Sequence, residues 1–441
     1  MPAPDVPLLQ ALRSRLGSGD LKGLLLRGAG AAFVIQILGG GLKYLLEVLY
    51  ARWTGAEGFG SFIYAVNWAL LLSLPAGLGL TVAVLRYVPA YLEQGDGGRM
   101  RALIRWSRGV TLLAGIGVGA LAAVGFSLWH PTRVDGVALR AGMGLVPLWA
   151  LMALQLALVQ GTRRIALAYA PSEVLRPLLA VLLGGAVFLA TGRLTPLLAL
   201  ACFGSAVVVV IGVQHAAIRR AFSSVPRGRA RPAVAEWMRV ALPLLVANGC
   251  FMALQRVDGL VLGAFHGARA AGLYEGAART TVLATTVLLA VSAIAAPTIG
   301  ALHARGDHAQ LQRMVRTAAR WMLLPSLALA LGLVLFATPI LRLWGPDFTD
   351  AAPALRILVV GQLVNAAVGP VGYLLSLTGH ERRVARVYAI AAGLDLVLCL
   401  LLVPPFGAIG AAIATSVATI LWNLWMFALV WKHLGVRSFA L

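Results

Sequence analysis

The chain has 441 residues, of which 60% are hydrophobic and only 12% are charged, and its formal net charge is +21. Its mean hydropathy is +0.86. An ordinary soluble domain is about 25% charged and no more than half apolar. The composition therefore excludes a soluble enzyme, a disulfide-rich secreted scaffold and a disordered protein, and it predicts an all-α integral membrane protein.

Apolar runs bounded by charged residues, glycine or proline predict twelve membrane-spanning helices. The predicted spans cover residues 28–51, 60–84, 109–129, 142–162, 171–191, 195–217, 240–264, 273–298, 318–341, 354–378, 385–404 and 407–431. They divide the chain into a cytoplasmic N-terminal segment (1–27), an N-terminal lobe of six helices (28–218), a basic cytoplasmic linker (219–239), a C-terminal lobe of six helices (240–431) and a cytoplasmic tail (432–441).

The basic residues are distributed unevenly between the two sides of these spans. If residue 1 is cytoplasmic, the inner segments hold 27 of the 37 basic residues, with Arg176 near the start of the fifth span counted among them, and the outer segments hold six. Basic residues favour the cytoplasmic side of a membrane, so both termini are expected in the cytoplasm. This distribution accounts for the positive charge through contact with membrane lipids, and a nucleic-acid partner is not expected.

The two predicted lobes share sequence patterns. ARWTGAEGFGSFIYA (51–65) resembles GAFHGARAAGLYEGA (263–277) at an offset of 212 residues, which pairs Gly55 with Gly267 and Gly60 with Gly272. YLEQGDGGRMRALIR (91–105) likewise resembles LHARGDHAQLQRMVR (302–316). Two repeats of six spans each have the same orientation and are related by a pseudo-two-fold axis along the membrane normal. This arrangement predicts a transporter of the alternating-access type, with a cavity between two like-oriented lobes.

Signatures of catalysis are missing from the sequence. There is no GxxxxGK[ST] phosphate-binding loop, no His/Cys/Glu spacing typical of a metal site, and no nucleophile–base pair in a span. We therefore expect a protein that is not an enzyme and that needs no cofactor.

Charged and amide side chains within spans are costly and indicate functional sites. The predicted substrate-binding residues are Lys43, Asn67, Arg256 and Arg279. Position 43 maps onto position 255, and Asn67 maps onto Arg279, at the repeat offset, which places these groups toward the cavity between the lobes. Arginine suits a phosphate ligand because its guanidinium binds in a bidentate manner and stays charged in a dry site.

The same residues are open to a structural interpretation. Lys43–Glu47 and Glu275–Arg279 are each spaced four residues apart, so each pair can neutralise itself along one helix. The candidates for ion coupling are Asp395, Asp258, Glu275 and Glu47. For Asp395 the competing interpretation is a hydrogen-bonded interior acid without a role in transport.

Three segments carry a resemblance to a known family. They are ARWTGAEGFGSFIYA (51–65), the Gly-Leu-Gly-Leu run at 77–80 followed by Arg86 and YLEQGD, and VPPFGAIGAAIATSVA (403–418). Together with the repeat, they resemble the polysaccharide (O-antigen) flippases of the multidrug/oligosaccharidyl-lipid/polysaccharide exporter superfamily, over nearly the whole chain.

This resemblance implies a V-shaped pair of six-helix lobes in the bacterial inner membrane. It implies the movement of an undecaprenyl-pyrophosphate-linked oligosaccharide to the outer leaflet for a surface polysaccharide such as lipopolysaccharide. A polysaccharide polymerase and glycosyltransferases are the protein partners that this role implies. The family's cationic cavity carries over to Lys43, Arg256 and Arg279 by position.

Three other functions remain open. A proton- or sodium-coupled multidrug exporter of the same superfamily predicts an acidic cavity, which Arg256 and Arg279 disfavour. A peptidoglycan-precursor flippase usually has further spans after the twelfth. A membrane-embedded polymerase or ligase needs larger outer loops than this sequence has.

Overall fold

A computed structural model describes residues 18–129, 134–162, 164–223, 232–305, 307–436 and 438. Within these residues the regular structure is entirely helical. The N-terminal half (residues 18–223) contains α2 (Ser18–Gly77), α3 (Leu80–Glu93), α4 (Gly97–Trp129), α5 (Gly136–Gly142), α6 (Leu145–Gln160), α7 (Ile165–Ala170), the π-helix η1 (Pro171–Leu175), α8 (Arg176–Thr191) and α9 (Pro196–Ala221).

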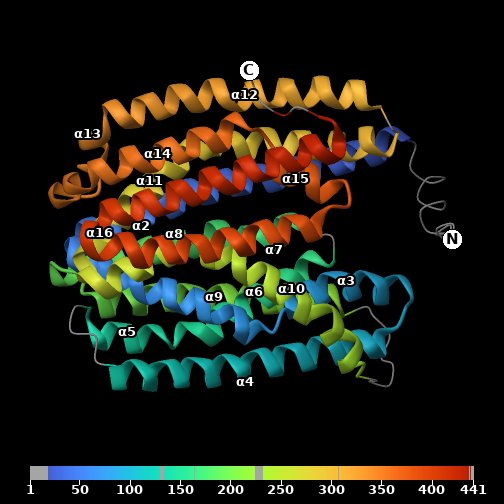
Figure 1. Cartoon of the computed structure of the whole chain (residues 1–441). Helices are drawn as coiled ribbons and strands as arrows, with labels where there is room; N and C mark the ends of the chain where they lie inside the picture. Colours follow the sequence, from blue (N-terminus) through green and yellow to red (C-terminus); the bar gives the residue numbers. More distant parts are fainter. Residues whose placement is uncertain are drawn as a thin grey trace.

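The C-terminal half (residues 232–438) continues the same helical bundle. It contains α10 (Val234–Leu254), α11 (Val257–Ala304), α12 (His308–Leu335), α13 (Ala337–Leu341), the 3₁₀ helix η2 (Pro346–Ala351), α14 (Ala352–Ala367), α15 (Val371–Leu377) and α16 (Glu381–Leu434). The long helices run side by side along one common direction (Figure 1). Helices suit such an apolar sequence because they satisfy every backbone polar group within one segment.

The lengths and compositions of the helices are those of a multi-pass integral membrane protein. Seven described helices are long and apolar enough to cross a membrane, and a bent pair, Pro346–Ala367 with Val371–Leu377, raises the number to eight. Large apolar side chains point away from the bundle: Leu189 is 86% exposed, Leu128 78% and Leu121 75%. Such a surface is expected for contact with lipid. The predicted all-α membrane fold is confirmed.

Three of the long elements fold back on themselves at a glycine. Gly55 in α2 has φ 74° and Gly267 in α11 has φ 86°, values that suit glycine because it lacks a Cβ atom. The rings of Tyr50 and Phe62 lie 5.2 Å apart, although twelve residues of straight helix would separate them by about 18 Å. The α16 helix bends in the same way at Gly407, where φ is 54°. Each of these elements therefore consists of two arms.

The repeat predicted from the sequence recurs in the backbone. Gly55 and Gly267 have nearly the same conformation, with ψ 173° and −178°. The Asp96 carboxylate accepts a hydrogen bond from the Arg99 amide at 2.9 Å, and Asp307 accepts one from Gln310 at 2.9 Å. Both aspartates thus cap the helix that follows them. Gly161 follows the fourth predicted span and Gly379 follows the tenth, but Gly161 is right-handed and Gly379 has φ 81°, so the backbones differ there.

The two halves meet where α2 crosses α11, and glycines allow the close approach. A Cβ atom added to Gly60 would lie 1.8 Å from the Ala268 carbonyl oxygen. A Cβ atom on Gly272 would lie 2.4 Å from the Ala56 carbonyl oxygen. Because Ala56 and Ala268 are themselves equivalent in the repeat, each half makes the same contact with the other. This reciprocity is the mark of a two-fold related interface.

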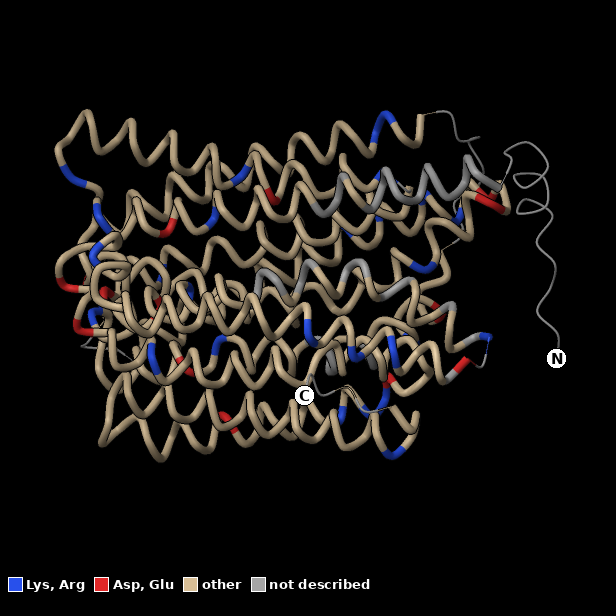
Figure 2. Tube along the Cα trace, turned by 90° about the horizontal axis from the view of Figure 1, so that it is seen from above, with Lys and Arg blue, Asp and Glu red and all other residues tan. Residues whose placement is uncertain are grey.

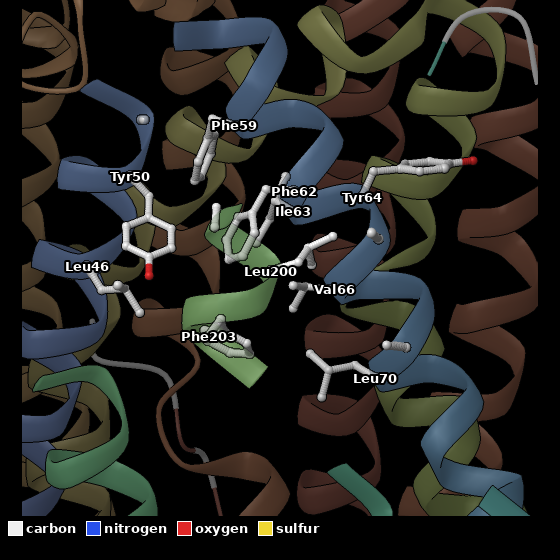
Figure 3. Packing of buried hydrophobic residues seen from close by; sticks show 14 of the residues in the cluster. Leu46, Tyr50, Phe59, Phe62, Ile63, Tyr64, Val66, Leu70, Leu200 and Phe203 are labelled. Atoms are coloured by element: carbon white, nitrogen blue, oxygen red, sulfur yellow. The ribbon is translucent and has the colours of Figure 1, made fainter. Parts of the chain in front are cut away.

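A hydrophobic core extends on both sides of this crossing. Tyr50 from the first arm of α2 and Phe62 from the second arm face each other, and Phe62 contacts Phe203 of α9 with ring centroids 5.7 Å apart (Figure 3). The same buried cluster continues into the C-terminal half through Trp344 and Phe348. The crossing is thus packed in apolar side chains from both halves.

Gly60→Ala is expected to destabilise the protein, because the added methyl group has no space beside the Ala268 carbonyl. Overpacking of this kind costs about 1–3 kcal/mol. Thermal unfolding of the purified protein in detergent measures the effect. Gly117→Ala in α4 is the control, since its Cβ atom would meet no heavy atom within 4 Å. Equal melting temperatures for Gly60→Ala and the wild type would contradict the close crossing.

Candidate functional site

Five polar side chains meet between the halves, and we call them the central ion cluster: Glu47, Asn67, Arg256, Glu275 and Arg279. Arg279 Nη2 donates to Glu275 Oε1 at 2.6 Å, and Arg279 Nε lies 3.3 Å from Glu47 Oε2. Arg256 Nη1 donates to Asn67 Oδ1 at 2.7 Å and lies 3.6 Å from Glu275 Oε1. The cluster links α2 to the C-terminal half and holds two arginines against two glutamates.

The repeat explains why these side chains converge. Asn67 follows Gly60 by seven residues, and Arg279 follows Gly272 by seven residues. Seven helical residues span about 10 Å. Both side chains therefore lie two turns from the glycine crossing, Asn67 on α2 and Arg279 on α11. The cluster therefore owes its position to the crossing of α2 and α11.

Arg256 comes from a break in the helix. The α10 helix ends at Leu254 and α11 begins at Val257, and the Arg256 amide donates to the Ala253 carbonyl at 3.0 Å across the turn between them. Non-helical backbone at membrane depth is tolerated where it is buried in protein or lines a water-filled space. The break thus presents a guanidinium group to the interface between the halves.

The side chains of the cluster are not completely buried. The exposed fractions of the side chains are 25% for Arg279, 18% for Glu47, 17% for Arg256 and 9% for Glu275. Charged residues are sparse along the helices between the two ends of the bundle (Figure 2). Arg256 Nε is buried and has no hydrogen-bond partner among the described residues. A ligand that reached the cluster would therefore find a donor that is still free.

Lys43 lies apart from this cluster. Its ammonium group pairs with the carboxylate of Glu173 in η1, not with Glu47, so the predicted Lys43–Glu47 pair is wrong. Tertiary packing explains this partner. A Cβ atom on Gly39 would lie 2.7 Å from the Glu173 carbonyl oxygen, so α2 and η1 are in contact one turn before Lys43. The other predicted pair, Glu275–Arg279, is confirmed at 2.6 Å.

Glu173 and Arg176 are interior charges that the sequence analysis missed. Arg176 is counted above among the basic residues of the inner segments, but it is only 7% exposed. Its guanidinium carbon lies 5.2 Å from the ring centroids of both Trp149 and Phe203. Its Nε donates to the Ser172 carbonyl at 3.2 Å. The helical span runs from Ile165 to Thr191, so it begins six residues before the predicted span 171–191, which already contained both charges.

The aspartates proposed for ion coupling are buried in the C-terminal half. Asp258 Oδ2 accepts hydrogen bonds from Tyr274 at 2.6 Å and from Thr415 at 3.1 Å. Asp395 is fully buried, with Cys399 Sγ 3.9 Å from its Oδ1, and its Oδ2 has no partner among the described residues. An ionised carboxylate oxygen without a donor is costly to bury. Asp395 is therefore placed where a proton or cation would relieve that cost.

Aromatic side chains close the interface beyond the cluster at the end near η2. Trp344 Nε1 donates to the Tyr44 hydroxyl at 3.1 Å, and the Phe59 ring lies 5.7 Å from Trp344. Arg52 Nε donates to the Leu343 carbonyl at 2.6 Å. At the opposite end, Trp237 Nε1 donates to the Tyr91 hydroxyl at 3.0 Å. The halves thus contact each other on both sides of the central ion cluster.

Two families match the sequence. Residues 25–303 match the family described as polysaccharide biosynthesis protein, and residues 243–401 match the family described as MatE. An uncharacterized membrane protein of Methanocaldococcus jannaschii, MJ1068, is 22% identical over 91% of this chain and 82% of its own length. The probable low-salt glycan biosynthesis flippase Agl15 of Haloferax volcanii is 22% identical over 89% of this chain and 81% of its own length.

Solved structures share the fold at low sequence identity. The lipid II flippase MurJ in an inward closed conformation has a TM-score of 0.71 and 15% identity, over 92% of this chain and 87% of MurJ. An inward-facing multidrug resistance MATE transporter has a TM-score of 0.67 and 15% identity, over 93% of this chain and 94% of that transporter. The arrangement of helices is therefore the one found in MurJ and MATE transporters.

Glu275→Gln is expected to lower stability, because it removes the carboxylate that Arg256 and Arg279 share. Breaking a buried ion pair by removing one partner costs about 3 kcal/mol. The measurement is the melting temperature of the purified protein. Asp350→Asn is the control, because its pair with Arg269 is 3.7 Å long and its side chain is 67% exposed, so a loss below about 1 kcal/mol is expected there. If both variants melt alike, the cluster is not a stabilising network.

Proposed function

Because the chain belongs to the polysaccharide biosynthesis protein family of the multidrug/oligosaccharidyl-lipid/polysaccharide exporter superfamily, we propose that it flips an undecaprenyl-pyrophosphate-linked oligosaccharide across the bacterial inner membrane. The chain is a membrane transporter and not an enzyme. The observation that carries the proposal is the central ion cluster, in which two arginines lie between the halves of the protein without being completely buried. The Agl15 relative, named for glycan biosynthesis, supports a lipid-linked glycan as the substrate class.

The proposed architecture has twelve spans in two lobes, residues 28–218 and 240–431, joined by the linker 219–239. The three folded-back elements support it: α2 and α16 each contribute to two predicted spans, and α11 completes the span begun by α10 and supplies the next one. The matching caps at Asp96 and Asp307 and the reciprocal glycine crossing support two like-oriented lobes. Alternating access then consists of rocking the lobes about this crossing, so that a V-shaped opening faces one side at a time. Both termini lie in the cytoplasm in this proposal.

The substrate binds by exchanging ion pairs. In the present structure Glu47 and Glu275 neutralise Arg279 and Arg256, and Glu173 neutralises Lys43. A diphosphate is negatively charged, as these carboxylates are, and it carries more charge than any one of them. It therefore replaces the carboxylates at Lys43, Arg256 and Arg279. Asn67 adds a neutral hydrogen-bond donor. Arginine holds phosphate through two parallel hydrogen bonds. The sugars remain in water between the lobes, and the lipid tail remains in the bilayer.

The membrane potential supplies part of the driving force. An inside-negative potential favours outward movement of an anionic head group by about 2.3 kcal/mol per charge per 100 mV. Proton movement supplies the rest of the driving force. The proposed coupling groups are Asp395 and Asp258 in the C-terminal half and Glu275 and Glu47 in the central ion cluster. Protonation of Glu47 or Glu275 frees an arginine for the diphosphate, which links proton uptake to substrate binding.

A coupled multidrug exporter is the alternative function. The MatE match over residues 243–401 and the likeness to MATE structures favour it. A cationic drug requires an acidic cavity, however, whereas the central ion cluster balances its two glutamates with two arginines. The polysaccharide family also matches the longer part of the chain, residues 25–303.

The variants Arg256→Ala and Arg279→Ala test the flippase proposal in a strain that lacks the gene. Each variant removes charged hydrogen bonds worth about 1.5–3 kcal/mol, so we expect at least a tenfold loss of surface polysaccharide. Lipid-linked oligosaccharide should accumulate on the inner leaflet. Arg356→Ala is the control, because this guanidinium donates to the Val334 carbonyl, away from the cluster.

Other results would count against the proposal. Normal polysaccharide with altered sensitivity to cationic drugs favours the exporter. Full restoration of surface polysaccharide by well-expressed Arg256→Ala and Arg279→Ala would show that both arginines have a purely structural role.

Asp395→Asn tests the coupling proposal. The amide keeps the size of the side chain but cannot take up a proton, so transport in proteoliposomes should lose its response to an imposed pH gradient. Transport driven by membrane potential alone should persist. Asp350→Asn, at an exposed site, serves as the control. An unchanged response to the pH gradient in Asp395→Asn excludes this residue from coupling.

A further inference from the structure

A second polar site lies far along the chain from the central ion cluster, at the start of α16. A cavity of about 440 Å³ opens there, lined by Gly379, His380, Glu381, Arg382, Arg383 and Arg386. We call it the α16 pocket. Its volume falls in the range of small-molecule sites, about 300–1,000 Å³. None of these residues takes part in the proposed transport path.

The α16 pocket has a large excess of positive charge. Three arginines from the first two turns of α16 face one carboxylate, that of Glu381. The end of the same helix lies close by, because the His433 ring stacks on the His380 ring with centroids 5.2 Å apart, and Lys432, which precedes His433, is a further basic residue. The hairpin at Gly407 thus brings both ends of α16 to one place. Such a concentration of cations is costly unless an anion is present.

One guanidinium donor in the α16 pocket is unused. Arg383 Nη1 is buried and has no hydrogen-bond partner among the described residues. The Arg383 and Val384 amides donate to the His380 carbonyl at 2.9 and 3.2 Å, and the start of the helix carries the positive end of its dipole. The turn is fixed at Gly379, with φ 81°, where the His380 amide donates to the Leu375 carbonyl at 2.9 Å. A preformed turn, a free guanidinium donor and a net positive charge are the features of a site for an oxyanion.

We propose that the α16 pocket binds a phosphoryl group. The guanidinium of Arg383 supplies paired donors that match the oxygens of a phosphate, and Arg382 and Arg386 supply charge at the rim of the pocket. The phosphoryl group comes either from the head group of an anionic lipid or from a soluble phosphate compound. Since the volume exceeds that of a single phosphate, the remainder accommodates the group esterified to it.

Binding to the purified, full-length protein tests this proposal with two probes. The first is phosphatidylglycerol in nanodiscs, against phosphatidylcholine nanodiscs, with lipid retention read by native mass spectrometry. The second is inorganic pyrophosphate in detergent, with affinity read by calorimetry. We expect saturable binding of one probe at one site per chain. Phosphatidylglycerol binding alone identifies the lipid source, and pyrophosphate binding alone identifies the soluble source.

The double variant R383Q/R386Q should weaken binding at least tenfold. The single variant Arg383→Lys keeps the charge but loses the paired donors, so a several-fold weakening is expected. The control R313Q/R316Q removes the same charge from exposed positions on α12. Melting temperatures of all variants report on folding, and Arg383→Lys still tests the proposal if the double variant unfolds. Absence of binding to both probes, or equal loss in the α12 control, would overturn it.

Discussion

The close crossing of α2 and α11 is the contact on which the rest of this molecule depends. Gly60 and Gly272 lie against the carbonyl groups of Ala268 and Ala56, so that a methyl group on either glycine has no space. This contact fixes how the two halves face each other. Two turns along the same helices, it brings Asn67 and Arg279 to opposite sides of one interface.

The charges near the crossing are balanced. Two arginines and two glutamates form the central ion cluster, and Lys43 is neutralised separately by Glu173. A cavity with uncompensated cations would be costly to keep at membrane depth. Balanced pairs avoid that cost in the empty protein, and a diphosphate with more charge than a carboxylate can still displace them. In this account the glutamates therefore hold the arginines in place until the substrate arrives. The α16 pocket differs, because its arginines have no comparable set of acids.

Much of the fold could be predicted from the sequence, because it rests on local and repeated patterns. Apolar runs indicate the helices, and the offset of 212 residues identifies Gly55 and Gly267 as equivalent turns. The interior charges could be found for the same reason, since a charged residue in an apolar run is conspicuous. A partner one turn away on the same helix could be predicted, as Glu275 was for Arg279, but partners distant in the sequence could not. Lys43 and Glu173 are 130 residues apart, and only the contact of Gly39 with η1 brings them together. Arg176 lies within the predicted fifth span, but the sequence alone does not show that its guanidinium packs against the rings of Trp149 and Phe203.

The central claim is that a diphosphate replaces the carboxylates of the central ion cluster. A structure of the protein in a nanodisc with its lipid-linked oligosaccharide bound tests it most directly. The account predicts phosphate oxygens within hydrogen-bond distance of Arg256 and Arg279, with Glu47 or Glu275 displaced from its present partner. A diphosphate bound elsewhere, with the pairs Glu47–Arg279 and Glu275–Arg279 still at their present distances of 3.3 and 2.6 Å, would contradict it.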